Sequence, residues 1–274
     1  KIVRFTPPMQ TPEVAVSHAA AEALAGGHPW VYREALARAP RASTGDEVQL
    51  LRGDGAALGR GLYDATSPLA VRLWTRGREP ITQALVAERV RRALALRALW
   101  FAHGGTTAYR LVHGEGDRTP GLVVDRYGSV AVVRLDGDAI RVSLPRWRDS
   151  LTTALLDAGV TTVVLREATK GEAPRHDVLA GPPPPPTVEV LEHGMPFVVD
   201  LARGQKTGAF LDQRENRRRV RGLAQGRRVL NLFSYAGGFS LAAALGGARH
   251  VTSVDIAASA RATAQESFRR AGVD

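Results

Sequence analysis

Alternation of apolar and polar positions dominates the first part of the chain and predicts short β-strands. Residues 45–51 alternate up to a glycine-bearing turn at 53–55, and residues 57–63 and 70–74 continue the pattern. Strands of this length, separated by turn residues, are typical of small barrels. We therefore predict a small β-barrel or curled sheet over residues 1–78.

The next part changes to a helical period and then returns to strands. Residues 81–101 predict an amphipathic helix in which arginines separate the members of one apolar face: Ile81, Leu85, Leu96, Leu99 and Trp100. Strands are predicted over residues 109–112, 121–125, 130–135 and 162–166, and a second helix over 146–156. Five consecutive prolines, Pro182 to Pro186, predict a stiff polyproline II spacer. The pattern predicts an α+β domain over residues 79–186 that ends in a linker.

The last part begins as a hairpin and becomes a strand–helix alternation. Residues 187–191 and 197–201 flank a turn at His193-Gly194, and a short arginine-rich helix follows. A buried parallel strand over 228–233, a glycine-bearing turn and a helix over 239–245 come next. A strand over 250–255 ends in an acid, and a helix over 259–270 follows. This order predicts the first half of a doubly wound, Rossmann-like domain over residues 187–274, so the fold class is α/β and α+β multidomain.

Composition excludes several classes of protein. Hydrophobic residues make up 44% of the 274 residues and charged residues 23%, which is typical of globular domains. The absence of cysteine excludes disulfides and thiolate chemistry within these residues, and the seven histidines show no metal-ligand spacing, so we predict no metal. No apolar run approaches the ~18 residues that span a bilayer, and the N-terminus lacks a secretory core, so we expect a cytoplasmic protein without a membrane partner.

The charge distribution points to a polyanion. The formal net charge is +10, and only three of the 37 basic residues are lysines, so part of the excess reflects a preference for arginine. Residues 203–228, however, hold nine basic residues against Asp212 and Glu215, a local net charge of +7. Such a concentration is typical of nucleic-acid binding, with a solvated arginine-rich helix face as the alternative.

The glycine-bearing turn and Asp255 predict a nucleoside site. Gly237 and Asp255 lie 18 residues apart, close to the spacing at which an acid on the second strand binds ribose hydroxyls. The turn lacks the dinucleotide fingerprint, and no phosphate loop precedes Lys206-Thr207. A nucleoside without phosphates remains, and S-adenosylmethionine fits; a tight turn that serves only packing is the alternative.

Two longer motifs resemble a known family. Residues 204–217 (GQKTGAFLDQRENR) and 229–240 (VLNLFSYAGGFS) look like the paired signatures of RlmI-type methyltransferases. Residues 27–32 and 59–64 look like that family's N-terminal PUA domain, and residues 117–128 (DRTPGLVVDRYG) are similar to its central α+β domain. The resemblance implies an S-adenosylmethionine-dependent enzyme that methylates C5 of a cytosine in bacterial 23S rRNA.

The resemblance also implies roles for individual residues. The cofactor would be lined by Asn231, Phe233, Ser234, Tyr235, Ala236, Gly237 and Gly238, and its ribose would be held by Asp255. Four residues would lie at the methionine end or the mouth of the site, with a hydrogen-bonded structural role as an equal alternative for each: Lys206, Thr207, Asp212 and Arg214. The charge cluster, and not the resemblance, predicts that the first segment and four arginines contact RNA phosphates: Arg217, Arg218, Arg219 and Arg221. Ala236 stands where the family usually has threonine, so one hydroxyl contact is missing.

Methylation at C5 of cytosine needs a cysteine that adds to C6. In the family this cysteine lies further along the catalytic domain, so we expect it beyond Asp274, in a chain truncated at both ends, and no catalytic residue within these 274. The polypeptide as given is then expected not to turn over. Alternatives are a methyltransferase of the same architecture acting on guanine N7, a non-catalytic RNA-binding protein and, more distantly, a nicotinamide dehydrogenase. A homodimer is one option for the assembly.

Overall fold

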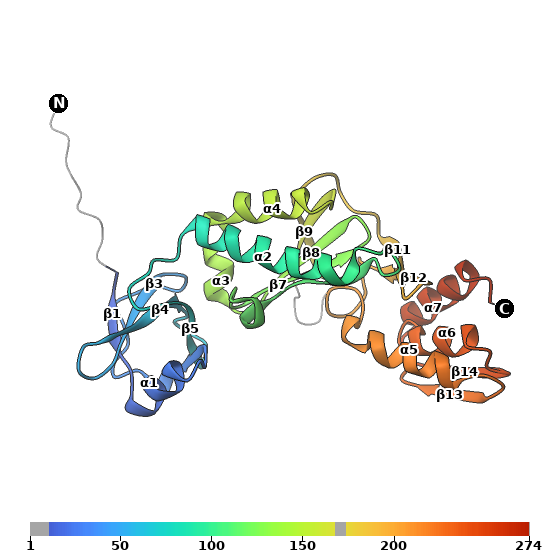
Figure 1. The fold of residues 1–274 in the computed structure, drawn as a ribbon, viewed down its shortest axis with the longest axis horizontal. Coiled ribbons are helices and arrows are strands. Elements are labelled where there is room, and N and C mark those ends of the chain that lie inside the picture. The colour runs from blue at the N-terminus through green and yellow to red at the C-terminus, as the bar shows by residue number, and fades with distance from the viewer. Residues whose placement is uncertain (1–10, 168–173, 274) are drawn as a thin grey trace. The chain divides into compact units, whose positions relative to one another are not determined.

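The computed structural model describes residues 11–167 and 174–273, and its contacts divide the chain into two compact units (Figure 1). The first unit contains the chain up to Val90 together with His113–Leu122 and Leu135–Leu151. The second contains Arg91–Val112, Val123–Arg134 and the chain from Thr152 onward. The division after Val90 falls within helix α2 (Gln83–Phe101). Single 3-10 turns lie at Arg33–Ala35, Gly114–Asp117, Leu144–Arg146 and Leu211–Gln213.

A five-stranded sheet forms most of the first unit, in the order β1-β3-β4-β5-β2. Its strands are β1 (Glu13–Ala15), β2 (Trp30–Tyr32), β3 (Glu47–Leu51), β4 (Ala57–Tyr63) and β5 (Leu69–Arg76). An antiparallel bridge between Val16 and Leu36 links the segments that follow the two edge strands, so the sheet curls as predicted. Helix α1 (His18–Ala25), capped by the Ser17 hydroxyl, was not predicted. Helix α3 (Asp138–Ser143) was also missed.

A second five-stranded sheet, in the order β10-β9-β8-β7-β6, begins the second unit. Its strands are β6 (Ala108–His113), β7 (Leu122–Tyr127), β8 (Val130–Leu135), β9 (Thr162–Glu167) and β10 (Arg175–Ala180). The four predicted strands and helix α4 (Arg148–Asp157) are confirmed, whereas β10 was not predicted.

Helix α2 buries a different face from the predicted one. Val86, Val90 and Leu94 are buried, whereas Leu99 and Trp100 are 77% and 75% exposed. Both stripes repeat with the helical period, and the contacts with the rest of the fold decide which of them is covered.

The proline run lies within the second compact unit. It connects β10 to the predicted hairpin of β11 (Thr187–Glu192) and β12 (Met195–Asp200). The Pro182 carbonyl accepts a bond from the Thr162 hydroxyl, and the Pro186 carbonyl accepts one from the Leu201 N–H. One hydrophobic core joins both sides of the run; its members include Tyr127, Val132, Val164, Val190, Phe197, Val199 and Leu241.

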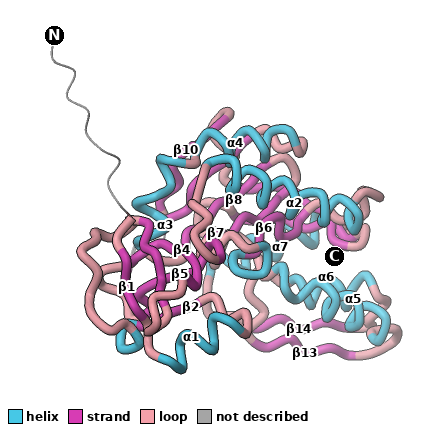
Figure 2. The backbone as a smooth tube through the Cα atoms, turned by 60° about the vertical axis from the view of Figure 1, so that its left-hand side comes forward, coloured by secondary structure: helices cyan, strands magenta, loops and turns pink. Residues whose placement is uncertain are grey.

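The predicted strand–helix alternation is confirmed. It consists of α5 (Arg214–Leu223), β13 (Arg228–Leu232), α6 (Gly238–Leu245), β14 (His250–Val254) and α7 (Ala258–Arg270). Strands β13 and β14 pair in parallel, and Figure 2 shows them side by side. The prediction that the first strand is buried is wrong: Leu230 and Leu232 are 62% and 54% exposed. Within the described residues β13 pairs only with β14, so much of this strand stays uncovered.

None of the helices in the described ranges is both long enough and apolar enough to cross a bilayer.

Candidate functional site

A bend connects β13 to α6; we call residues 233–239 the glycine bend. Phe233, Tyr235 and Gly237 have φ angles of 56°, 47° and 73°, all in the left-handed region. Non-glycine residues rarely adopt this region, and such strain gathers at functional sites. At Gly237 a Cβ would stand 2.8 Å from the Cβ of Ala264, so only glycine fits there without a shift.

The carboxylate of Asp255 lies against the glycine bend. Its Oδ2 accepts a hydrogen bond of 2.7 Å from the Tyr235 N–H, and its Oδ1 accepts one of 2.9 Å from the Ala257 N–H. These two backbone donors, that of Ala257 first, hold the pKa of Asp255 below its ordinary value. Each oxygen keeps further lone pairs, and the side chain is only half-buried. The carboxylate is therefore ionised and able to accept further hydrogen bonds.

Asn231 faces the helix behind the bend. Its side-chain amide donates to the Ser240 hydroxyl over 2.8 Å, and the Ser253 hydroxyl donates to the same oxygen over 2.6 Å. These bonds join β13, β14 and α6 directly beneath the bend. They give Asn231 a structural role, beside its predicted contact with the cofactor.

A second loop lies against the bend; we call residues 204–209 the Lys206 loop. The Tyr235 hydroxyl accepts a bond of 2.7 Å from the Gln205 N–H and donates one of 3.1 Å to the Gly208 carbonyl. Burial raises the pKa of Tyr235, so this hydroxyl stays protonated at neutral pH. The structure thus brings together the bend and the loop, two of the predicted site segments.

The four residues predicted for the mouth of the site divide into two groups. Lys206 and Asp212 are exposed, with the ammonium 3.4 Å from Asp212 Oδ1 and 4.3 Å from the Phe210 ring centre. The Arg214 guanidinium is bonded to Glu215 and lies 4.9 Å from the Phe101 ring centre. Thr207 is only 1% exposed, and its hydroxyl bonds Asp125 and Tyr127. These bonds support the structural role for Thr207, and its contact with a ligand stays a prediction.

Arg217 is the buried member of the arginines predicted to contact RNA, and that contact stays a prediction. Its side chain is 8% exposed, and it forms two bonds of 2.6 and 2.5 Å to Glu192. Arg218 and Arg219 are exposed on the same helix and Arg221 is half-buried. Arg218 and Arg221 line a pocket of about 300 Å³ between α5 and the hairpin turn, next to His193. These three arginines remain available to a polyanion.

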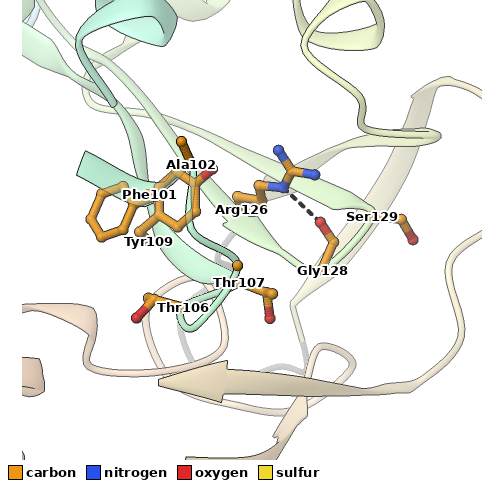
Figure 3. Close-up of a pocket in the computed structure, with 9 residues that line it drawn as sticks. Phe101, Ala102, Thr106, Thr107, Tyr109, Arg126, Gly128 and Ser129 are labelled. Atoms are coloured by element: carbon orange, nitrogen blue, oxygen red, sulfur yellow. Dashed lines mark hydrogen bonds between the residues drawn. The ribbon is translucent and has the colours of Figure 1, made fainter. Parts of the chain in front are cut away.

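The pocket in Figure 3, about 380 Å³ in volume, has none of the predicted site residues in its lining. Its aromatic members Phe101 and Tyr109 stack on each other at 3.9 Å. Arg126 donates to three backbone carbonyls, those of Gly128, Ala158 and Gly159. Because none of the predicted site residues lines this pocket, we assign it no role in the site.

Several residues of the site were missed by the sequence reasoning. Asp125, Tyr127 and Arg166 of the central sheet hold the Lys206 loop, and Ser240 joins the strands beneath the bend. Only Asp125 and Tyr127 carried a signal, because they lie in the motif at residues 117–128. Elsewhere, His, Asp and Glu of the described ranges form no group of three that could hold a metal ion.

A parallel strand pair, a glycine bend over a helix and an acid at the tip of the second strand define a Rossmann-like nucleoside-binding domain. A family model described as S-adenosylmethionine-dependent methyltransferase matches residues 110–274, and a model of a PUA-like domain matches residues 14–76. The chain therefore belongs to the S-adenosylmethionine-dependent methyltransferase family, with a PUA-like domain at its N-terminal side.

Similar proteins have ribosomal RNA in their names. A ribosomal RNA large subunit methyltransferase of Deinococcus radiodurans is 42% identical over 92% of this chain and 64% of its own length. Ribosomal RNA large subunit methyltransferase I of Klebsiella pneumoniae is 33% identical over 96% of this chain and 67% of its own length. The chain thus spans about two thirds of the length of these relatives.

Solved structures agree with this fold. A structure described as a SAM-dependent methyltransferase from Streptococcus mutans has a TM-score of 0.83 and 27% identity, covering 96% of this chain and 68% of its own. A methyltransferase structure named SMU.776, complexed with SAH, has a TM-score of 0.84 and 27% identity over 96% of this chain and 67% of its own.

Proposed function

We propose that the chain binds S-adenosylmethionine at the glycine bend and serves the transfer of its methyl group to large-subunit ribosomal RNA. The observation that carries the proposal is the ionised Asp255 carboxylate, hydrogen-bonded to the bend at Tyr235 and able to accept more bonds. The family match supports the cofactor, and the names of the relatives support the RNA substrate.

Each part of the site meets a different part of the cofactor. Asp255 accepts hydrogen bonds from ribose hydroxyls. The missing Cβ atoms at Gly237 and Gly238 make room for Ala264 and Arg217, so the bend packs closely against the protein behind it. The Lys206 ammonium offers a positive charge for the methionine carboxylate. When bound, the cofactor supplies an electrophilic methyl group on a sulfonium. Phe233, Ser234 and Ala236 complete the proposed lining of the bend.

Calorimetry with S-adenosylmethionine tests this site directly. We expect the chain to bind S-adenosylmethionine and S-adenosylhomocysteine, and not NAD. Asp255→Ala removes the ribose acceptor and should weaken binding at least tenfold, by the loss of one or two charged hydrogen bonds. Glu266→Ala is the matched control, because Glu266 is an acid of the same unit that pairs with Arg269 and Arg270. Equal affinity of the two variants would refute the site, and tighter binding of NAD would favour a dehydrogenase.

We further propose cytosine C5 as the target atom, on the resemblance of the two signature motifs. This reaction needs a thiolate, and these 274 residues contain no cysteine, whereas methylation of guanine N7 needs none. Incubation of the chain with labelled cofactor and unmodified 23S rRNA distinguishes the two. We expect cofactor binding without label transfer; transfer by this chain would favour a base that needs no thiolate.

Localisation and assembly are two broader expectations. An enzyme of ribosomal RNA works in the cytoplasm, where we place this protein. A homodimer stays a prediction that light scattering on the purified protein tests.

A further inference from the structure

The central-sheet motif at residues 117–128 has a direct contact with the Lys206 loop. Asp125 and Tyr127, both in β7, are 1% and 0% exposed. They meet Thr207, which is also 1% exposed, 82 and 80 residues further along the chain. The polar atoms of two distant motifs are therefore paired in the interior of one compact unit.

Counting protons fixes the direction of this hydrogen-bond chain. The Thr207 hydroxyl has one proton, which it donates to Asp125 Oδ2 over 2.6 Å. The Tyr127 hydroxyl must then donate to Thr207 Oγ1 over 2.8 Å, and it accepts the Ala209 N–H over 3.1 Å. Two residues of the loop, Thr207 and Ala209, are thus hydrogen-bonded to the sheet, and the hydroxyl protons of Thr207 and Tyr127 are both used.

The charge of the buried Asp125 carboxylate is compensated. Arg110, in the neighbouring strand β6, donates Nε to Oδ1 over 2.8 Å and Nη2 to Oδ2 over 3.0 Å. A second arginine, Arg166 of β9, donates to the carbonyls of Leu201 and Gly204. The sheet therefore holds both ends of the loop.

The middle of the loop points the other way. Gln205 and Lys206 are exposed, and Lys206 has a φ of 54°, an uncommon conformation for lysine. The Gln205 N–H donates to the hydroxyl of Tyr235 in the glycine bend. With Thr207 anchored inside, the backbone turns so that Lys206 is presented beside the bend.

We propose that Asp125 and Tyr127 are positioning residues that act through Thr207 to hold Lys206 beside the bound cofactor. The inference rests on the proposed function, since it gives the central-sheet motif a role in that same site. The motif at residues 117–128 thereby helps to set the affinity of the glycine bend for S-adenosylmethionine, although the two are distant in the sequence.

Paired substitutions at Thr207 test the hydroxyl itself. Thr207→Val keeps the shape and removes the donor, whereas Thr207→Ser keeps the donor and removes the methyl group. Tyr127→Phe removes the second hydroxyl, and Tyr109→Phe is its control, a buried tyrosine of the same sheet that stacks on Phe101. Two readouts are compared in the full chain: hydrogen exchange of the amides at residues 205–209, and the Kd for S-adenosylmethionine.

We expect Thr207→Val and Tyr127→Phe to speed exchange in the loop and to raise Kd about tenfold, the effect of losing one buried hydrogen bond to a charged network. Thr207→Ser and Tyr109→Phe should stay close to the parent chain in both readouts. An unchanged Kd in Thr207→Val, or equal damage in Thr207→Ser, would overturn the proposal. If the parent chain binds no cofactor, the proposed function fails. Hydrogen exchange then still tests the positioning role, which is overturned if Thr207→Val leaves the exchange rate of the loop unchanged.

Discussion

Removal of the Arg217 guanidinium, as in Arg217→Met, should destabilise the fold. Arg217 and Glu192 have side chains that are 8% and 2% exposed, and they share two short hydrogen bonds. The guanidinium also donates to the Phe210 carbonyl over 3.0 Å. The variant would leave the Glu192 carboxylate buried without its cation.

The magnitude follows from the cost of an uncompensated buried charge. Breaking a buried ion pair by removing one partner costs about 3–5 kcal/mol. In a domain of this size about 1 kcal/mol shifts the melting temperature by ~2–4 °C, so the unit containing α5 should melt roughly 6–20 °C lower. The double variant Glu192→Leu/Arg217→Met removes both charges and should regain most of this loss, because apolar replacement of a buried pair is often near neutral.

Differential scanning calorimetry measures the effect, with Arg219→Met as the control. Arg219 lies on the same helix and is exposed, so its replacement should change the free energy of unfolding by no more than about 0.5 kcal/mol. The reasoning is refuted if Arg217→Met and Arg219→Met melt at the same temperature, or if the double variant is no more stable than Arg217→Met.

Three further predictions follow from the same geometry. Arg218→Ala and Arg219→Ala should each weaken RNA binding and flatten its salt dependence by about one phosphate contact, whereas Arg92→Ala on α2 should not; an unchanged salt slope would count against the RNA surface. Because the pKa of Asp255 is lowered, its stabilising contribution is complete above the ordinary value of ~3.9 and is lost as pH falls through the lower folded value. Ionisation of Asp255 should therefore leave the affinity for the cofactor unchanged between about pH 8 and pH 5. Calorimetry would contradict this if the affinity titrated in that range and Asp255→Asn abolished the titration. Gly204→Ala would place a Cβ 2.3 Å from the Asp200 carbonyl oxygen and should lower the free energy of unfolding in urea by about 1–3 kcal/mol. Gly222→Ala, with open space around its Cβ, should be neutral or stabilising. Equal stability of the two variants would contradict this prediction, because the loop would then have shifted to make room for the Cβ.

Local signals made the strand–bend–helix segment predictable. The two apolar strands, the glycines between them and the acid at the end of the second strand all lie within residues 228–255. The hydrophobic pattern and the glycine-to-acid spacing were therefore sufficient to predict this segment. The hairpin at His193-Gly194 was predictable for the same reason, since its turn residues adopt the required positive φ angles of 49° and 73°.

Long-range partners were not visible in the sequence. The arginines of α5 have the same chemistry, and only the fold shows that Arg217 meets Glu192, 25 residues earlier, while its neighbours face outward. Thr207 is similar, because its partner Asp125 lies 82 residues away. The buried stripe of α2 also depended on its surroundings, since the exposed Leu99 and Trp100 fit the helical period as well as the buried Val90.

A crystal structure of the chain with S-adenosylhomocysteine would test the central claim most directly. The account predicts the ribose hydroxyls within hydrogen-bonding distance of the Asp255 carboxylate, and the nucleoside against the backbone of residues 233–239. A ligand seated in the pocket of Figure 3, or one at the bend without contact to Asp255, would contradict it.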